Sequence, residues 1–296
     1  MKGWMMTVVP MAFLSASAAH AGAVPQRIAL PGVSEPYELV WHDEFEGDDY
    51  DRTKWECPIS FRQGASLWYP DNLTIANGVA HFDIRYNPDW KIHYQSAALR
   101  TQKRYDRVDL FTFTYGYVEA RCKLPVETNC NYWAAFWLLS THNDGKSTDT
   151  RDGLEVDIFE TFVRGRKDNR NIAAFHWGGY GKNHNSCGIP YKAGGPDPYA
   201  DNEWHVFGLL WTEREYVVYL DGVEVVRTDL MGLVDPHRKD ATPSNGPLRR
   251  PSLIKLSCEA AQWASPCGRW VANPPRHDRF EVDYVRVYQA KSLQRF

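Results

Sequence analysis

Three acidic residues lie close together in one short segment of the chain. Glu155, Asp157 and Glu160 alternate with the β-forming residues of Leu154–Glu160. Side chains two residues apart in a strand share a face, so Glu155 and Asp157 point the same way, while Glu160 is out of step by one residue. One β-bulge between Asp157 and Glu160 would bring all three carboxylates to one face, and such bulges are common beside active sites. We therefore expect this strand to line a cleft.

Carboxylates at this spacing favour acid–base chemistry. Like charges at short range keep at least one carboxyl protonated near neutral pH. Hydrolysis of a glycoside uses such a pair, since one carboxylate attacks the anomeric carbon while a protonated carboxyl donates its proton to the departing oxygen. Two Glu side chains leaning inward on a concave sheet favour the short carboxyl separation of a retaining enzyme. A solvated face of an edge strand and a calcium site are the alternatives.

The rest of the chain predicts the strands that must position these acids. Short runs rich in Val, Ile, Thr, Tyr, Phe and Trp recur between clusters of Gly, Pro, Asn and Asp, with almost no helical periodicity. The expected strands are 37–45, 79–85, 95–100, 116–124, 132–139, 154–163, 171–176, 204–211, 215–220, 223–227, 253–257 and 280–288. A dozen short strands predict an all-β, two-sheet sandwich. We expect a tight hairpin at Asp221–Gly222, and long surface loops at 178–202 and 231–251.

Composition and the N-terminal residues bear on partners and location. The net charge is −3, without a block of like charge, which argues against nucleic acid as the main partner. Aromatic residues make up 14% of the chain, and their flat rings suit sugar faces, an ordinary core or a protein interface. Residues 1–21 have the features of a secretory signal peptide. We expect a secreted or periplasmic monomer, with no membrane attachment after cleavage, whose residues 22–296 form one domain.

The six cysteines predict disulfides if the chain is exported. They are Cys57, Cys122, Cys130, Cys187, Cys258 and Cys267. An even number in an exported chain permits three disulfides, and the short separations favour Cys122–Cys130 and Cys258–Cys267. Free buried thiols are the alternative. A zinc site is disfavoured, because no CxxC pair occurs.

The acidic motif and its surroundings resemble glycoside hydrolase family 16, whose signature is Glu-x-Asp-x-x-Glu in its bulged form. Similar segments follow in the family's order, at 39–45, 54–55, 96–100, 115–125, 133–139, 204–207, 220–222 and 280–288. The resemblance covers about Tyr37 to Tyr288. It implies a concanavalin-like β-jelly-roll sandwich of two antiparallel sheets with a concave cleft. It also implies an endo-acting retaining β-glycanase of polysaccharides that needs no cofactor for catalysis.

The resemblance also implies roles for individual residues. Glu155 would be the nucleophile, Glu160 the acid/base, and Asp157 a hydrogen-bond partner of the nucleophile. A structural calcium ion would be held by Asp283 and a backbone carbonyl at Gly78, although a simple surface acid is the alternative for Asp283. A catalytically silent carbohydrate-binding sandwich and a polysaccharide transglycosylase remain as other functions.

Six further residues are candidates for binding sugar. They are Trp133, Trp137, His176, Trp177, Trp263 and Arg164. Trp133 and Trp137 are four residues apart and so share a strand face, but core packing is the alternative for every Trp. Arg164 belongs to a basic loop with Arg166, Lys167 and Arg170. Guanidinium groups suit sulfate, and a solvated loop is the alternative.

For the polymer itself we expect a β-linked galactan of agar, porphyran or carrageenan type, or a host glycan. Residues 176–184 are similar to the galactan-active branches of the family. An axial 4-hydroxyl puts a polar group on one ring face, so a galactose site needs an added hydrogen-bonding side chain, and His176 could supply it. A β-1,3(4)-glucan of laminarin type is the alternative.

Overall fold

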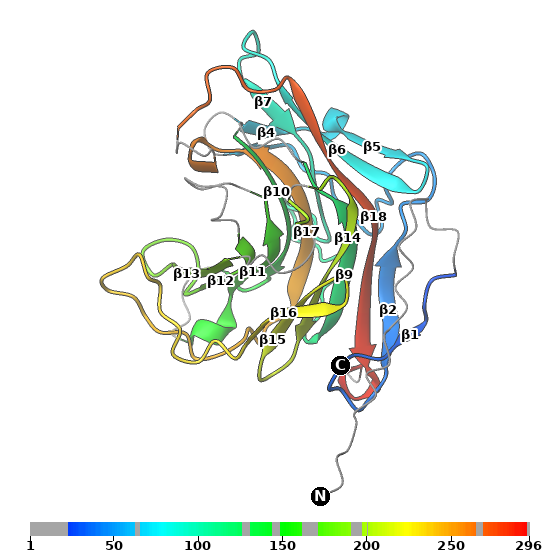
Figure 1. Cartoon of the computed structure of the whole chain (residues 1–296), viewed down its shortest axis with the longest axis vertical. Helices are drawn as coiled ribbons and strands as arrows, with labels where there is room; N and C mark the ends of the chain where they lie inside the picture. The colour runs from blue at the N-terminus through cyan, green and yellow to red at the C-terminus, as the bar shows by residue number, and fades with distance from the viewer. Residues whose placement is uncertain are drawn as a thin grey trace, which may run out of the picture.

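The computed structural model describes residues 23–62, 66–125, 131–143, 149–161, 171–190, 197–199, 201–264 and 269–294. Across these ranges the chain folds into two β-sheets packed face to face, which confirms the all-β sandwich (Figure 1). The helical elements of these ranges are short 3₁₀ turns: η1 Pro70–Asn72, η2 Thr150–Asp152, η3 Gln262–Ala264 and η4 Lys291–Leu293. None of these turns is long or apolar enough to cross a membrane.

The larger sheet forms the outer layer of the sandwich. In the described ranges its twelve strands are β1 Arg27–Ile28, β2 Tyr37–Asp43, β3 Ser60–Arg62, β4 Ser66–Trp68, β5 Leu73–Ala76, β6 Val79–Tyr86, β7 Tyr94–Ser96, β9 Gly116–Lys123, β14 Trp204–Trp211, β15 Tyr216–Leu220, β16 Val223–Thr228 and β18 His277–Ala290. Neighbouring strands pair antiparallel, except that β4 pairs parallel with β7. The long strand β18 pairs with β2, β6 and β9, so it holds the centre of the sheet together.

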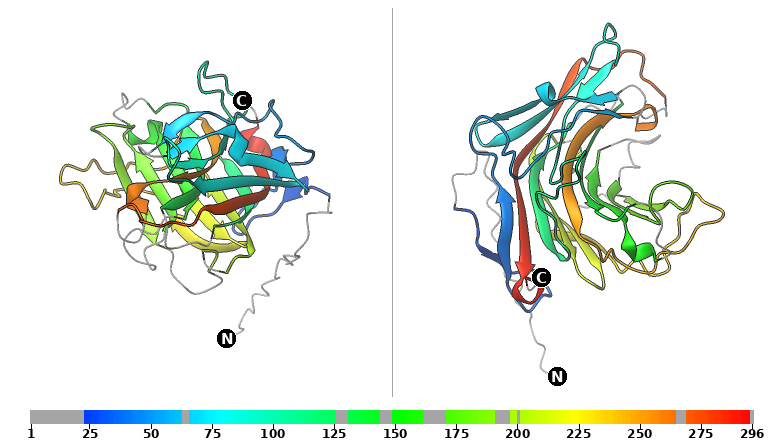
Figure 2. Two further views of the ribbon diagram at one scale, coloured as in Figure 1. Left: turned by 90° about the horizontal axis from the view of Figure 1, so that it is seen from above. Right: turned by 180° about the vertical axis from the view of Figure 1, so that it is seen from behind.

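The smaller sheet carries the acidic motif. Its six described strands are β8 Ala98–Arg100, β10 Tyr132–Ser140, β11 Leu154–Glu160, β12 Asn171–Trp177, β13 Asn185–Pro190 and β17 Ser252–Ala260. They lie in the order β13-β12-β11-β10-β17-β8. The sheet is strongly curved, and its hollow face points away from the larger sheet (Figure 1, Figure 2). We call this the concave face.

Each predicted strand has a counterpart in the structure, but β1, β3, β4 and β5 were not predicted and two predicted segments differ. The tight hairpin is confirmed, since Asp221 and Gly222 have φ of 50° and 75° and join β15 to β16. The run 95–100 is split between β7 and β8, which belong to different sheets. Within 178–202, which we expected to be a loop, the structure has strand β13. This segment is rich in polar residues and Gly, and its pairing with β12 makes it a strand.

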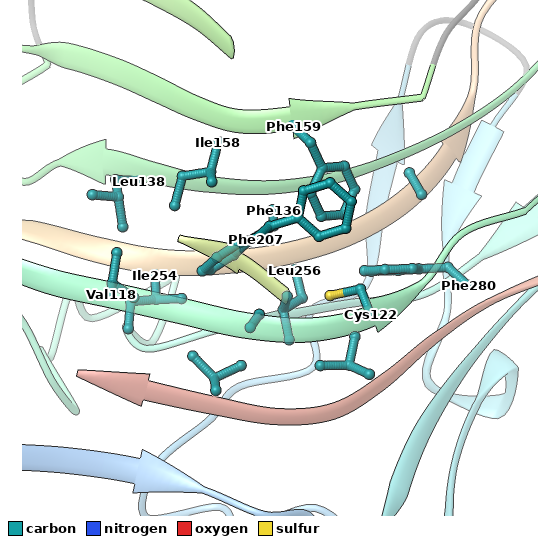
Figure 3. Packing of buried hydrophobic residues seen from close by; sticks show 14 of the residues in the cluster. Val118, Cys122, Phe136, Leu138, Ile158, Phe159, Phe207, Ile254, Leu256 and Phe280 are labelled. Carbon is teal, nitrogen blue, oxygen red and sulfur yellow. The ribbon is translucent and has the colours of Figure 1, made fainter. Parts of the chain in front are cut away.

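The main core fills the space between the two sheets. Phe136 and Phe159 of the smaller sheet meet Phe207 and Phe280 of the larger one (Figure 3). The rings of Phe159 and Phe207 have centroids 4.4 Å apart, and both side chains are fully buried. Large rings from both layers therefore fix how the smaller sheet lies on the larger one.

The disulfides we expected are not shown. The structure has Cys57, Cys122 and Cys187 as free thiols. Cys122 points into the core between the sheets (Figure 3). Its expected partner Cys130 lies outside the described residues, and so does Cys267, the expected partner of Cys258.

Candidate active site

The predicted β-bulge is present in strand β11. Asp157 pairs with Trp137 and Phe159 pairs with Phe136, so Ile158 has no partner on β10. Ile158 and Phe159 both pack into the core although they are adjacent in sequence (Figure 3). The bulge therefore turns Glu160 to the same face as Asp157, the face opposite the core. All three carboxylates lie on the concave face.

Burial and mutual repulsion favour a protonated carboxyl in this row. Glu160 is 7% exposed, and its burial together with the charge of Asp157 raises its pKa well above the usual value. A hydrogen bond with the Trp133 indole favours the charged form of Glu160 but does not outweigh these effects. Burial and the charge of Glu155 also raise the pKa of Asp157, to about 6. Glu160 is therefore the group most able to hold a proton near neutral pH.

Glu155 lies among hydrogen-bond donors instead. The Tyr180 hydroxyl donates to Glu155 Oε2. His176 Nε2 lies 3.4 Å from Glu155 Oε1 on the neighbouring strand β12, where the two residues are directly paired. These donors stabilise a carboxylate at this position. Glu155 and Glu160 thus lie on the same face, but Glu155 is beside hydrogen-bond donors whereas Glu160 is buried next to another carboxylate.

His176 connects the acids to a second histidine. Its Nε2 is 3.1 Å from Asp157 Oδ2, and its Nδ1 is 2.9 Å from His184 Nε2. Burial alone would lower the pKa of His176, but the charges of Glu155, Asp157 and Glu160 outweigh it and raise the pKa to about 10. Burial and the charge of His176 lower the pKa of His184. A protonated His176 therefore donates to His184 and lies within ion-pair distance of the Glu155 and Asp157 carboxylates.

Three of these side chains also lie close enough together to be considered as ligands of a metal ion. Within the described ranges, Glu155, Asp157 and His176 form the one group of three or more His, Cys, Asp or Glu side chains close enough to share an ion. In the metal-free protein the pKa of His176, about 10, keeps a proton on the ring, so an ion would have to displace that proton to use His176 as a ligand. Without an ion, the three side chains form an acid–base cluster.

The expected calcium ligands lie elsewhere and have other contacts. Asp283 is 3% exposed, and its Oδ2 accepts a hydrogen bond from Arg121 Nη1 at 2.7 Å. Gly78 lies in the turn between β5 and β6, with φ of 73°. Arg121 therefore pairs with one oxygen of the Asp283 carboxylate, and a calcium ion held by Asp283 and the Gly78 carbonyl stays a prediction.

Three of the expected tryptophans lie at or beside the concave face. Trp133 and Trp137 lie on it in strand β10, as their spacing predicted. Trp263, in η3, packs on Trp133 with ring centroids 4.7 Å apart, and both rings are half-buried. Trp137 is only 7% exposed, and its Nε1 donates to Ser257 Oγ. Trp133 and Trp263 are therefore the more accessible surface for a sugar ring.

Two other expected sugar-binding residues, Trp177 and Arg164, are not part of the acidic site that the structure describes. Trp177 is 2% exposed, and its Nε1 donates to the Thr242 carbonyl at 2.7 Å. It points to the opposite face of β12 from His176, so the structure places Trp177 away from the acids. Arg164 lies outside the described residues.

The sequence analysis missed three residues of this face. Tyr180 and His184 follow β12 in a segment where Gly178, Gly179 and Gly181 all have positive φ, so no strand periodicity places them. Lys255 lies in strand β17, directly opposite Trp137, and is 5% exposed. A lone lysine among the apolar residues of 252–260 was a usable signal, because lysine is almost never fully buried unless it is paired.

Comparison with known proteins identifies the family. Residues 66–271, more than half of the chain, match the family described as glycosyl hydrolases family 16. The chain belongs to this family. The bulged Glu-x-Asp-x-x-Glu strand lies within the matched residues, so membership in family 16 and the geometry of the acids agree.

Curated relatives and solved structures of family 16 resemble the chain over most of its length. The β-glucanase of Rhodothermus marinus is 27% identical over 86% of this chain and 85% of its own length. Glucan endo-1,3-β-glucosidase A1 of Niallia circulans is 24% identical over 85% of this chain, which spans 38% of that protein's length. β-Porphyranase E of Zobellia galactanivorans is 25% identical over 83% of this chain and 85% of its own length. The X-ray structure of endo-β-1,3-glucanase from Pyrococcus furiosus shares the fold, with a TM-score of 0.65 and 24% identity over 90% of this chain and 99% of that one.

Proposed function

We propose that this chain is an endo-acting retaining β-glycanase in which Glu155 is the nucleophile and Glu160 the acid/base. The observation that carries the proposal is the contrast between two carboxyls on one face of β11. Burial raises the pKa of Glu160, while Tyr180 donates a hydrogen bond to Glu155 and His176 lies within ion-pair distance of it. A protonated acid beside an ionised carboxylate is the pair that two-step glycoside hydrolysis needs.

The reaction follows from these protonation states. A Glu155 oxygen attacks the anomeric carbon, the glycosidic C–O bond breaks, and the departing oxygen takes the Glu160 proton. Glu160, now ionised, removes a proton from a water molecule that attacks the same carbon and releases Glu155. Asp157 and His176 act as positioning residues, because His176 bridges Glu155 and Asp157 through Nε2.

For the substrate we propose a β-1,3- or mixed-linkage β-1,3-1,4-glucan, in place of the galactan that we expected from the sequence. Two of the three relatives compared above are named glucanases or glucosidases, whereas one is a porphyranase. The argument for galactan relied on His176 as a donor to an axial hydroxyl. Both nitrogens of His176 already have partners, in Asp157 and His184, so His176 is not available for that contact.

We also propose that the protein is exported. The support is the signal-like sequence of residues 1–21, with Lys2 followed by an apolar run and small residues up to Ala21. A polymer-degrading enzyme must meet substrates that do not enter the cell, which agrees with export.

The test of the catalytic roles is Glu155→Gln with an azide rescue. Glu155→Gln keeps the shape of the side chain and removes the attacking oxygen, so hydrolysis of laminarin should fall by several decades with little change in Tm. Azide added to Glu155→Gly should restore turnover and give an inverted glycosyl azide, because azide takes the place of the nucleophile. The matched control is Glu224→Gln, the same change at an exposed residue of β16, which should behave as wild type.

The substrate is tested on a panel in parallel. Laminarin, barley glucan, agarose and porphyran are digested and reducing ends are counted over time, which also separates hydrolysis from transfer, since transfer conserves the number of ends. Release from the two glucans supports the proposal. Release from a galactan alone would restore our earlier expectation, and near-normal activity of Glu155→Gln would exclude the assigned nucleophile.

A further inference from the structure

A row of charged and aromatic residues crosses the concave face beside the acids. Asp157 of β11 pairs with Trp137 of β10, Trp137 pairs with Lys255 of β17, and Lys255 pairs with Arg100 of β8. Directly paired residues of adjacent strands point to the same face. Lys255 and Arg100 therefore lie side by side on the face that carries the acids.

Lys255 is a buried amine without an acidic partner among the described residues. It is 5% exposed, and its Nζ has no hydrogen bond or ion pair with the residues that the structure describes. Its Nζ lies 3.5 Å from the ring centroid of Trp137 and 5.3 Å from that of Trp68. Aromatic rings attract a cation but do not neutralise it. An ammonium in this position is costly to the free protein unless something else balances it.

The arginines near Lys255 each pair with their own carboxylate, so they do not provide an acidic partner for Lys255. Arg62 pairs with Glu259 through Nε at 3.0 Å, and Arg100 pairs with Glu56 through Nε at 2.8 Å. Each arginine therefore has one carboxylate, and Lys255 has none. Arg100 is 9% exposed, and its Nη2 is buried without a hydrogen-bond partner in the described structure. Two side chains with unused donor groups thus belong to residues that pair directly across β8 and β17.

A role in packing alone accounts poorly for this arrangement. An apolar residue of similar length would fill the space beside Trp137 without the desolvation cost of a charge. Burial and the charge of Arg62 lower the pKa of Lys255 well below its usual value, and Glu155 and Glu259 only partly oppose them. A buried donor pair of this kind on the substrate face is typical of a site that a ligand completes.

We propose that Lys255 and Arg100 bind an anionic substituent, a carboxylate or a sulfate, carried by a sugar of the glycan next to the bond that is cleaved. The inference rests on the proposed function, since it takes the glycan to lie along the concave face. The guanidinium Nη2 and the ammonium would donate to different oxygens of the substituent. The enzyme would then prefer acidic β-glucans to neutral ones.

Binding of such a group has a signature that a purely structural lysine lacks. An anion beside Lys255 favours its charged form, so binding an acidic ligand takes up a proton from the buffer. Calorimetry in phosphate and in Tris measures this uptake, because the two buffers differ in ionisation enthalpy. A neutral ligand at the same site gives no such uptake from Lys255.

The experiment measures binding on the full chain with Glu160→Gln, which blocks hydrolysis. The probes are laminarihexaose, laminarihexaose oxidised at C6 to carboxylates, and laminarihexaose sulfated at C6. We expect one acidic probe to bind at least about tenfold tighter than the neutral one, as expected for one charge-assisted hydrogen bond. The probe that shows the preference identifies the substituent as carboxylate or sulfate.

Variants in the same background decide whether Lys255 is responsible. Lys255→Met should abolish both the preference and the proton uptake, and its Tm should not fall, because the change replaces an unpaired buried amine with an apolar side chain of similar length. Lys255→Gln should give the same losses and decides the matter if the Met variant does not fold. Lys291→Met removes a lysine that is 67% exposed and pairs with Glu38, so it is the matched control and should keep both signals.

The outcomes separate this proposal from the proposed function. Equal affinity for all three probes, or a preference that survives both Lys255 variants, would overturn it. If wild-type enzyme hydrolyses neutral laminarin but no acidic probe is preferred, the subsite alone is wrong. If no glucan is hydrolysed yet an acidic probe binds through Lys255, the proposed substrate is wrong and the anion site stands.

Discussion

Glu155 and Glu160 are the same residue type with different chemistry, and the difference comes from their neighbours. Glu160 is 7% exposed and feels the charge of Asp157. Glu155 accepts from Tyr180 and lies beside His176, whose pKa of about 10 keeps it positively charged. A single charge beside these two carboxyls can therefore shift the pH range in which the enzyme is active.

Asp157→Asn tests that statement. Above pH 6 the Asp157 carboxylate is ionised, and its charge helps to raise the pKa of Glu160. Removing the charge lowers the pKa of Glu160, so the acid loses its proton at lower pH and the basic limb of kcat/KM moves to lower pH. A pH profile of laminarin hydrolysis measures the shift.

The control for Asp157→Asn is the same change at a solvated position. Asp240 has 81% of its side chain exposed and pairs only with Arg238 at the surface, so Asp240→Asn should leave the profile unchanged. A basic limb that stays in place or moves to higher pH in Asp157→Asn would contradict the assigned coupling.

At the scale of one strand, the bulge at Ile158 decides which residues face the substrate. Deleting Ile158 leaves Asp157 opposite Trp137, Phe159 opposite Phe136 and Glu160 opposite Ala135, so a regular ladder forms with Glu160 still on the concave face. The deletion removes a fully buried side chain, so we expect a fall in Tm, while hydrolysis is retained because both catalytic carboxyls keep their face. Thermal melting and a laminarin assay measure both effects.

Ile158→Val is the matched control for that deletion. It keeps the bulge and removes one buried methylene, which should cost about 0.5–1.5 kcal/mol of unfolding free energy and leave activity within a few-fold of wild type. A deletion variant that folds but has lost hydrolysis would contradict the expectation that pairing with β10 alone keeps Glu160 on the concave face.

Strand patterns in the sequence predicted the bulge and missed contacts made by loops. The parity of Glu155, Asp157 and Glu160 was sufficient, because alternation in a strand is a local rule. The position of Trp177 depends on Thr242, which is 65 residues away in sequence. Periodicity holds no information about such a contact.

Pairing partners explain the remaining differences. Strand β13 contains Asn185, Gly188 and Pro190, which are poor β-formers, and it exists because β12 pairs with it. The donors Tyr180 and Lys255 became visible as parts of the site only when the sheet order placed them beside the acids. Sequence reasoning thus located the reacting pair, and the fold supplied its surroundings.

At the scale of the whole molecule, the reactivity of the cysteine thiols tests whether disulfides link distant parts of the chain. Burial raises the pKa of Cys57 to about 12 and that of Cys122 well above its usual value, while Cys187 is only half-buried. Among these three thiols we expect Cys187 to be the readily modified one in the folded protein, since the thiolate is the reactive form. Titration with a thiol reagent, with and without denaturant, measures this.

Denaturant should expose at least three thiols in the unreduced protein, namely Cys57, Cys122 and Cys187. Cys187→Ser should remove the fast-reacting thiol and leave the other two unchanged. An unfolded, unreduced chain without free thiols would show that these cysteines form disulfides after all.

Strand β18 has a consequence for how the protein is made. It comes after every other described strand in the chain, yet it lies between β9 and β6, which do not pair with each other, and it also pairs with β2. While the ribosome is still adding residues before His277, the two halves of the larger sheet have nothing to join them. The nascent chain therefore stays without its finished outer layer until synthesis has passed Ala290.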